Sequence, residues 1–113
     1  MKVLLVCAGG CSTSILMKKL MKYAEDNGIP LEEIKATGIH SYMNHCHKYD
    51  IILMGPQMGY QRDDVIKGSG GMPVEVIPPA DYGVGNCKNI FKLIDKCMAQ
   101  LEEQQGSAAE GQA

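Results

Sequence analysis

The chain lacks the features that mark several large classes of protein. No apolar run among its 113 residues approaches the ~20 residues that cross a bilayer, so we expect no membrane span. Basic residues are not in excess, and the formal net charge of −2 argues against nucleic acid as the main partner. The apolar run after Lys2 is shorter than the core of a signal peptide, which has about 7–15 residues. These absences, with no internal repeat, favour a globular cytoplasmic protein.

The cysteines are too few for a disulfide scaffold. There are five of them, an odd number, and each is expected to stay a free thiol in a reducing compartment. For Cys97, inside a predicted helix, the expected role is a small buried hydrophobe. The cluster of His40, His45, Cys46 and His47 has no Cys-x2-Cys pair beside it, and adjacent residues of a helix point about 100° apart. We therefore predict no metal site and interpret the cluster as polar helix surface.

Short apolar segments alternate with helical patterns along the chain. Strands are predicted over residues 2–6, 31–38, 51–54 and 73–77. Helices are predicted from Ser12 or Thr13 to the Asn27-Gly28 stop, and over residues 41–48, 63–67 and 86–104. The apolar residues of the first helix recur at helical spacing: Ile15, Leu16, Leu20, Met21 and Ala24.

This alternation predicts a fold of the α/β class. We expect one domain over residues 1–104, with a parallel sheet of about four strands and helices on both faces. Residues 105–113 are rich in Gly, Ala, Ser and Gln, and we expect them to be disordered.

The strongest functional signal lies in residues 3–16. An apolar run ends there in Cys7, and a turn rich in Gly, Ser and Thr leads into the first helix. Backbone N–H groups in such a turn and the helix dipole favour an anion, and the same field favours thiolate over thiol. We predict that Cys7 is a nucleophile in a phosphate-binding loop. The residues expected to hold the phosphate are Ala8, Gly9, Gly10, Cys11, Ser12, Thr13 and Ser14.

Several chemistries are open to such a loop. A cysteine phosphatase carries an arginine at the position of Thr13, where it clamps the phosphate, and the neutral hydroxyl here argues against fast hydrolysis. A thiophosphate without that clamp remains a good phosphoryl donor. The alternatives are a cysteine phosphatase or arsenate-reductase-like enzyme, and a thiol-redox module using Cys7 and Cys11. A plain Gly-rich turn with a buried cysteine is the structural alternative.

Two further loops are expected to share the edge of the sheet with Cys7. Parallel sheets bind ligands beyond the carboxyl ends of their strands, and residues 55–62 and 78–85 follow two of the predicted strands. Asp81 would repel phosphate and is expected to orient another group. The possible partner or rim residues are Gln57, Tyr60, Tyr82 and Gly83, and also Arg62; ordinary turn chemistry is the alternative for each.

Three lysines lie on the first predicted helix. Lys18, Lys19 and Lys22 could face an acidic partner, although a charged outer helix face is the commoner explanation.

Several motifs follow Cys7 in order along the chain: Gly10-x-Ser12-Thr13-Ser14, Tyr49-Asp50, Gly55-Pro56-Gln57, Tyr60, residues 73–77 and Asp81-Tyr82-Gly83. With them the chain resembles, over about residues 2–101, the IIB component of the bacterial phosphotransferase system in its lactose/cellobiose (chitobiose) family. One position differs, because Cys11 stands where typical relatives carry methionine.

The resemblance implies a phosphotransferase that acts as a phosphoryl carrier without a cofactor. In this family the cysteine, here Cys7, accepts a phosphoryl group from a phosphohistidine of the IIA component. It then passes the group to a sugar bound by the membrane IIC component, for example a β-linked disaccharide such as cellobiose or chitobiose. The IIC component chooses the sugar. The resemblance also implies a monomer that does not itself span the membrane.

Overall fold

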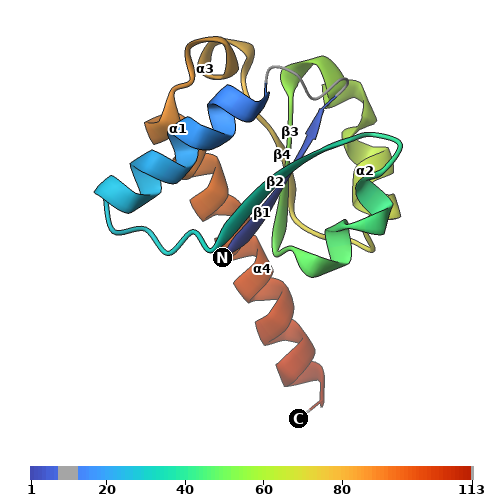
Figure 1. Cartoon of the computed structure of the whole chain (residues 1–113). Coiled ribbons are helices and arrows are strands. Elements are labelled where there is room, and N and C mark those ends of the chain that lie inside the picture. Colours follow the sequence, from blue (N-terminus) through green and yellow to red (C-terminus); the bar gives the residue numbers. More distant parts are fainter. Residues whose placement is uncertain (8–12, 113) are drawn as a thin grey trace.

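The centre of the protein is a parallel sheet of four strands in the order β2-β1-β3-β4 (Figure 1). The computed structural model describes residues 1–7 and 13–112, and the side chains of residues 1–7 and 15–103. The strands are β1 (Lys2–Cys7), β2 (Glu33–Gly38), β3 (Ile51–Met54) and β4 (Val74–Val76). The prediction of a four-stranded parallel sheet is therefore confirmed.

Helices cover both faces of the sheet, as predicted. They are α1 (Thr13–Asp26), α2 (Arg62–Gly68), α3 (Pro79–Val84) and α4 (Cys87–Gln112), with 3-10 turns η1 (Tyr42–Asn44), η2 (Cys46–Lys48) and η3 (Pro56–Gln61). Figure 1 shows α1 on one side of the sheet and α2 on the other. None of the described helices has both the length and the apolar character that crossing a bilayer requires.

The core consists of two layers because alternate residues of a strand face opposite sides. Val3 and Leu5 of β1 pack on the side of α1 and α4. Leu4 and Val6 pack on the other side, with Tyr42 of η1 and Val65 of α2. Strand β1 is buried on both faces, which explains its unbroken apolar sequence.

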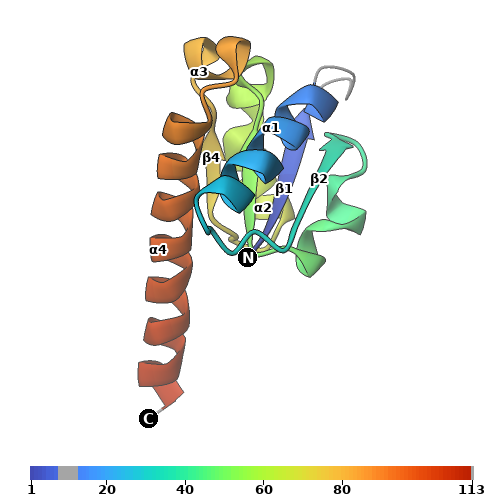
Figure 2. The ribbon, with the colours of Figure 1, turned by 60° about the vertical axis from the view of Figure 1, so that its left-hand side comes forward.

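Helix α1 buries fewer of its apolar side chains than the helical periodicity of the sequence predicts. Leu16, Leu20 and Ala24, four residues apart, lie in the core, whereas Ile15 and Met21 are exposed. A helix on the surface of a sheet contacts it along one face only, so apolar residues beside that face remain in solvent. Figure 2 shows α1 in front of the sheet with its outer side uncovered.

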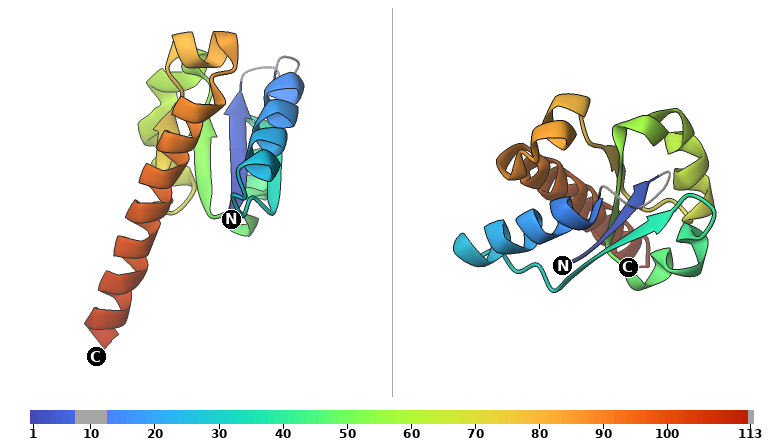
Figure 3. Two further views of the ribbon diagram at one scale, coloured as in Figure 1. Left: turned by 90° about the vertical axis from the view of Figure 1, so that its left-hand side faces the viewer. Right: turned by 45° about the horizontal axis from the view of Figure 1, so that its top comes forward.

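The structure differs from the sequence prediction at three places. Residues 41–48 form two 3-10 turns rather than one helix, and the loops after β3 and β4 contain η3 and α3. Both of these begin with a proline, whose fixed φ suits the first turn of a helix. Helix α4 continues to Gln112, through the segment that we expected to be disordered, and extends well past the sheet (Figure 3). Adding a residue to an existing helix is favourable for Ala, Glu and Gln.

Candidate functional site

Cys7 is the last residue of β1, at the carboxyl edge of the sheet. Only 4% of the residue is exposed, and its partner in the register is Gly38 of β2. Its Sγ–H donates a weak hydrogen bond to the carbonyl oxygen of Thr37, with 3.7 Å between the heavy atoms. The thiol therefore lies almost fully buried at the end of a central strand.

The strand order places this edge at the switch point of the sheet. From β1 the chain crosses to β2 on one side, and from β2 it crosses back to β3 on the other. The ends of β1 and β3 are joined by a hydrogen bond of 3.0 Å from the Gly55 N–H to the carbonyl oxygen of Val6. Ligands of open parallel sheets bind beyond the strand ends at such a point.

Helix α1 begins at Thr13, at the same edge of the sheet (Figure 3). Its first N–H groups and its dipole make that edge favourable for an anion. Of the residues predicted to hold phosphate, Thr13 and Ser14 form the first turn of α1. The others, Ala8, Gly9, Gly10, Cys11 and Ser12, lie outside the described residues.

The tertiary structure brings three of the predicted rim residues together. Gln57 from η3, with Tyr82 and Gly83 from α3, lines one pocket of about 370 Å³ with Ile15 and Lys19 of α1. We call it the α1–α3 pocket; Leu16 and Gly85 complete its lining.

Gly55 lies between residues of this pocket and the end of β1. A Cβ on Gly55 would lie 2.9 Å from Gln57 Oε1, 3.8 Å from Tyr82 Cε2 and 3.9 Å from the Val6 carbonyl oxygen. The first of these distances is short, so a larger residue at position 55 would displace the flexible end of the Gln57 side chain.

Other predicted rim residues lie elsewhere or have another role. Tyr60 is 79% exposed, and its hydroxyl accepts a hydrogen bond of 2.9 Å from Gln61 Nε2. Asp81 Oδ1 accepts a hydrogen bond of 3.0 Å from Asn89 Nδ2 at the start of α4, in line with the expectation that it orients another group.

Arg62 is turned toward β4. Its Nε donates a 3.0 Å hydrogen bond to the carbonyl oxygen of Val74, and its Nη2 lies 3.7 Å from Glu75 Oε1. Arg62 therefore connects α2 to the edge strand β4, and it is not among the residues that line the α1–α3 pocket.

Sequence reasoning missed the contact between Lys19 and Gly85. Gly85 ends α3 in the left-handed conformation, with φ of +65°, which favours glycine. The Cδ and Nζ atoms of Lys19 lie 3.0 Å from the position that a Cβ on Gly85 would take. A glycine after a short helix was the available signal, but nothing in the sequence pairs it with a lysine of α1.

Two other cysteines are held as neutral thiols. Burial raises the pKa of Cys97 from 9.0 to about 12. Burial also raises the pKa of Cys87, because it outweighs the opposite effect of the Lys19 ammonium.

Around His45 and His47, and elsewhere among the described residues, no group of three or more His, Cys, Asp or Glu side chains is placed to hold a metal ion.

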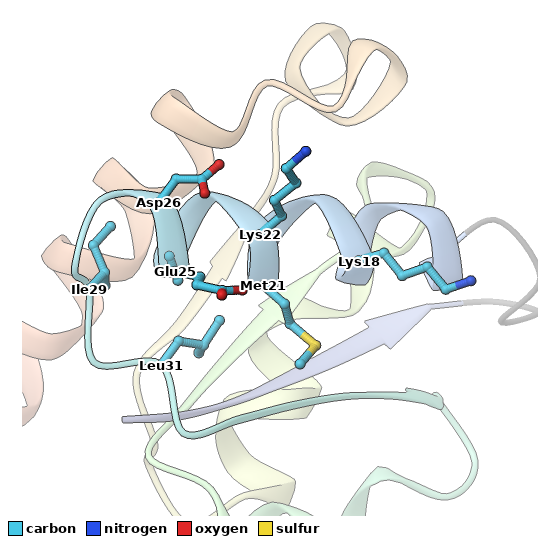
Figure 4. Close-up of a pocket in the computed structure, with 8 residues that line it drawn as sticks. Lys18, Met21, Lys22, Glu25, Asp26, Ile29 and Leu31 are labelled. Atoms are coloured by element: carbon cyan, nitrogen blue, oxygen red, sulfur yellow. The ribbon is translucent and has the colours of Figure 1, made fainter.

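A larger pocket of about 690 Å³ lies along the second half of α1 and its connection to β2. Figure 4 shows the side chains of Met21 and Leu31 below the helix, and those of Lys22 and Asp26 above it. Its lining contains two lysines and two acidic residues, so it presents no net charge to an anion. We do not include it in the site.

Comparison with known proteins gives one consistent family. The family model described as "PTS system, Lactose/Cellobiose specific IIB subunit" matches residues 2–93. The cellobiose-specific EIIB component of Lactococcus lactis subsp. lactis (strain IL1403) is 38% identical over 102 residues, covering 85% of this chain and 94% of that protein. The oligo-beta-mannoside-specific EIIB component of Bacillus subtilis (strain 168) is 34% identical over 93 residues, covering 80% and 89%.

A solved structure agrees. The cellobiose-specific phosphotransferase IIB component of Borrelia burgdorferi superimposes with a TM-score of 0.72 at 30% sequence identity, over 88% of this chain and 93% of that one.

Proposed function

The chain belongs to the lactose/cellobiose-specific IIB family of the sugar phosphotransferase system, and from this premise we propose that Cys7 carries the phosphoryl group. IIB components are phosphotransferases that work with IIA and IIC components, and they transfer the phosphoryl group covalently without a cofactor. In this chain the IIB domain spans residues 1–104, with the phosphate held by residues 8–14.

The relay has two steps. In the first, the Cys7 thiolate attacks the phosphorus of a phosphohistidine on the IIA component; the S–P bond forms, the N–P bond breaks and neutral imidazole leaves after taking up a proton. In the second, a hydroxyl of the sugar bound to IIC attacks the same phosphorus. The O–P bond forms, the S–P bond breaks, the hydroxyl proton is lost and the Cys7 thiolate is regenerated.

The position of Cys7 is the observation that carries this proposal. It ends the central strand β1 at the switch point of the sheet, and α1 begins at the same edge. A phosphoryl group on that sulfur would lie within the favourable field of the helix N-terminus.

The cysteine phosphatase alternative is not favoured. A phosphatase needs a guanidinium fixed over the phosphate, and Arg62 is the only arginine of the chain. It is already bonded to Val74 and lies beside Glu75. Without this clamp the phosphoryl group remains transferable.

We propose a β-linked disaccharide, such as cellobiose or chitobiose, as the final acceptor. The relatives named above act on cellobiose and on an oligo-β-mannoside, two β-linked saccharides, which supports this class without choosing a sugar. We also propose that the protein works as a cytoplasmic monomer.

The test is the mass of the intact protein after incubation with phosphoenolpyruvate, the general phosphotransferase components and a IIA component. We expect the gain of one phosphoryl group, lost in Cys7→Ser and retained in the control Cys11→Met. Gain of the group by Cys7→Ser would refute the assignment. Rapid hydrolysis of the isolated phosphoprotein would contradict a relay, and loss of the gain in Cys11→Met would direct attention to the second thiol.

A further inference from the structure

Lys19 places a positive charge on the wall of the α1–α3 pocket. Its Nζ is held beside Gly85, at the turn between α3 and α4. The ion pairs among the described side chains involve the N-terminus, Arg62 and Lys96, and none includes Lys19. The nearby Cys87 thiol, whose pKa burial raises, supplies no negative charge at neutral pH. The ammonium of Lys19 therefore has no internal counter-charge among these residues.

Exposed apolar side chains lie at and beside this pocket. Ile15, which lines the pocket, is 64% exposed, and Val84, which lies in the chain between the lining residues Gly83 and Gly85, is 71% exposed. A Cβ on Gly83 would meet no atom within 4 Å, so the space in front of it is open. Large exposed apolar side chains that flank a polar group are typical of the centre of a protein interface.

The pocket lies near the end of β1. Gln57 and Tyr82 line the pocket and approach Gly55, whose N–H binds the carbonyl oxygen of the residue before Cys7. Lys19, however, follows Thr13 by six residues, which is about 9 Å along the axis of α1. Its ammonium lies beside Gly85, at the turn between α3 and α4. Lys19 is therefore placed to bind a partner rather than the transferred group.

Resting on the proposed function, we propose that the α1–α3 pocket seats an acidic side chain of the phosphohistidine-bearing partner. Lys19 supplies the ion pair, and Ile15 and Val84 supply the apolar flank. A donor that brings its phosphorus within bonding distance of Cys7 must cover this edge of the sheet, and so it also covers the pocket. A carboxylate fits both the unpaired ammonium and the open space before Gly83.

The test is a binding titration of the full chain with the unphosphorylated IIA component. Lys19→Gln should raise the Kd about tenfold and reduce its dependence on salt. Lys22→Gln is the matched control, because it makes the same charge change three residues further along α1 and lies outside the pocket. It should leave the Kd within about twofold.

A second variant tests the shape of the pocket. The Cβ of a residue at position 83 meets no other atom, so Gly83→Leu should add bulk at the pocket and raise the Kd, whereas Gly83→Ala should raise it less. Equal Kd values for Lys19→Gln and Lys22→Gln would overturn the proposal. The proposal would also be overturned if Lys19→Gln left the Kd unchanged but slowed phosphoryl transfer to Cys7 at saturating donor. Lys19 would then act on the phosphoryl group.

These results can be separated from a failure of the proposed function. Binding of the unphosphorylated partner does not depend on phosphoryl transfer, and uptake of the group by the unaltered chain is measured separately by mass. A Lys19 effect confined to transfer from Cys7 to the sugar would also overturn the proposal, since it would place the IIC component on the pocket.

Discussion

Replacing Gly68 with alanine should destabilise the protein, although the same change stabilises most helices. Gly68 is the last residue of α2 and lies outside the left-handed region, so alanine can adopt its backbone conformation. The added methyl group would nevertheless overlap the hydroxyl of Tyr42, and it would lie 3.0 Å from Tyr42 Cζ and 3.4 Å from Met43 Sδ. Tyr42 is only 6% exposed, and its hydroxyl lies 3.4 Å from the carbonyl oxygen of Asp64, so the ring has little room to move.

Two opposing effects set the magnitude. Alanine in place of glycine within a helix contributes about 0.5–1 kcal/mol of stability. Inserting a methyl group into a filled core costs about 1–3 kcal/mol. The second effect is larger, so we expect Gly68→Ala to lower the free energy of unfolding by about 1–2 kcal/mol.

Urea unfolding followed by circular dichroism measures this difference. Tyr42→Phe removes the hydroxyl that the methyl group would meet, so Gly68→Ala should cost less than half as much in that background. Gly83→Ala is the control, since its methyl group meets nothing and should raise the stability by about 0.5–1 kcal/mol. If Gly68→Ala is as stable as the unaltered protein, or costs the same in both backgrounds, the steric argument is refuted.

Three further predictions concern stability. Asn86→Ala should cost about 1 kcal/mol, because Asn86 Oδ1 accepts the Asn89 N–H (3.2 Å) at the start of α4, and Asn86→Asp should restore most of it in urea unfolding. Stability should fall above pH 9.0, because burial raises the pKa of Cys97 from 9.0 to about 12 and that of Tyr49 from 10.0 to about 12. In that window the unfolded chain binds fewer protons than the folded one, so the free energy of unfolding decreases as pH rises, and a flat profile would contradict this. Glu75→Gln should change the free energy of unfolding by less than about 1 kcal/mol, because its partners Lys96 and Arg62 lie 3.6 and 3.7 Å away and remain partly solvated. A larger loss that added salt does not reduce would contradict this.

The absence of a fixed arginine near Cys7 fits the work of a carrier. A tight permanent clamp on the phosphoryl group would favour its retention or its hydrolysis, whereas a carrier must release it to a second partner. In our proposal, helix α1 and its preceding loop hold the group, and Lys19 acts on the donor protein instead. Binding of the partner and stabilisation of the phosphoryl group are then separate tasks of neighbouring residues, which separate variants can test.

The sequence by itself determined the local elements and the centre of the site. The apolar runs of β1 and β3 are recognisable because strands buried on both faces tolerate few polar residues. The turn after Cys7 predicts the start of α1, because capping residues and glycines act over a few neighbouring positions. The ordered motifs from Cys7 to Gly83 were sufficient to indicate the family.

Only the tertiary structure decided how distant segments meet. It left Ile15 exposed, although Ile15 belongs to the apolar periodicity of α1. It bonded Arg62 to β4, although the sequence put Arg62 in a loop expected at the rim. It also set Lys19 against Gly85 and the ring of Tyr42 against Gly68. Periodicity and turn chemistry act along a few residues of the chain. The contacts of Lys19 with Gly85 and of Tyr42 with Gly68, in contrast, join segments that are more than twenty residues apart, and they depend on the order of the strands and on which helix covers which face.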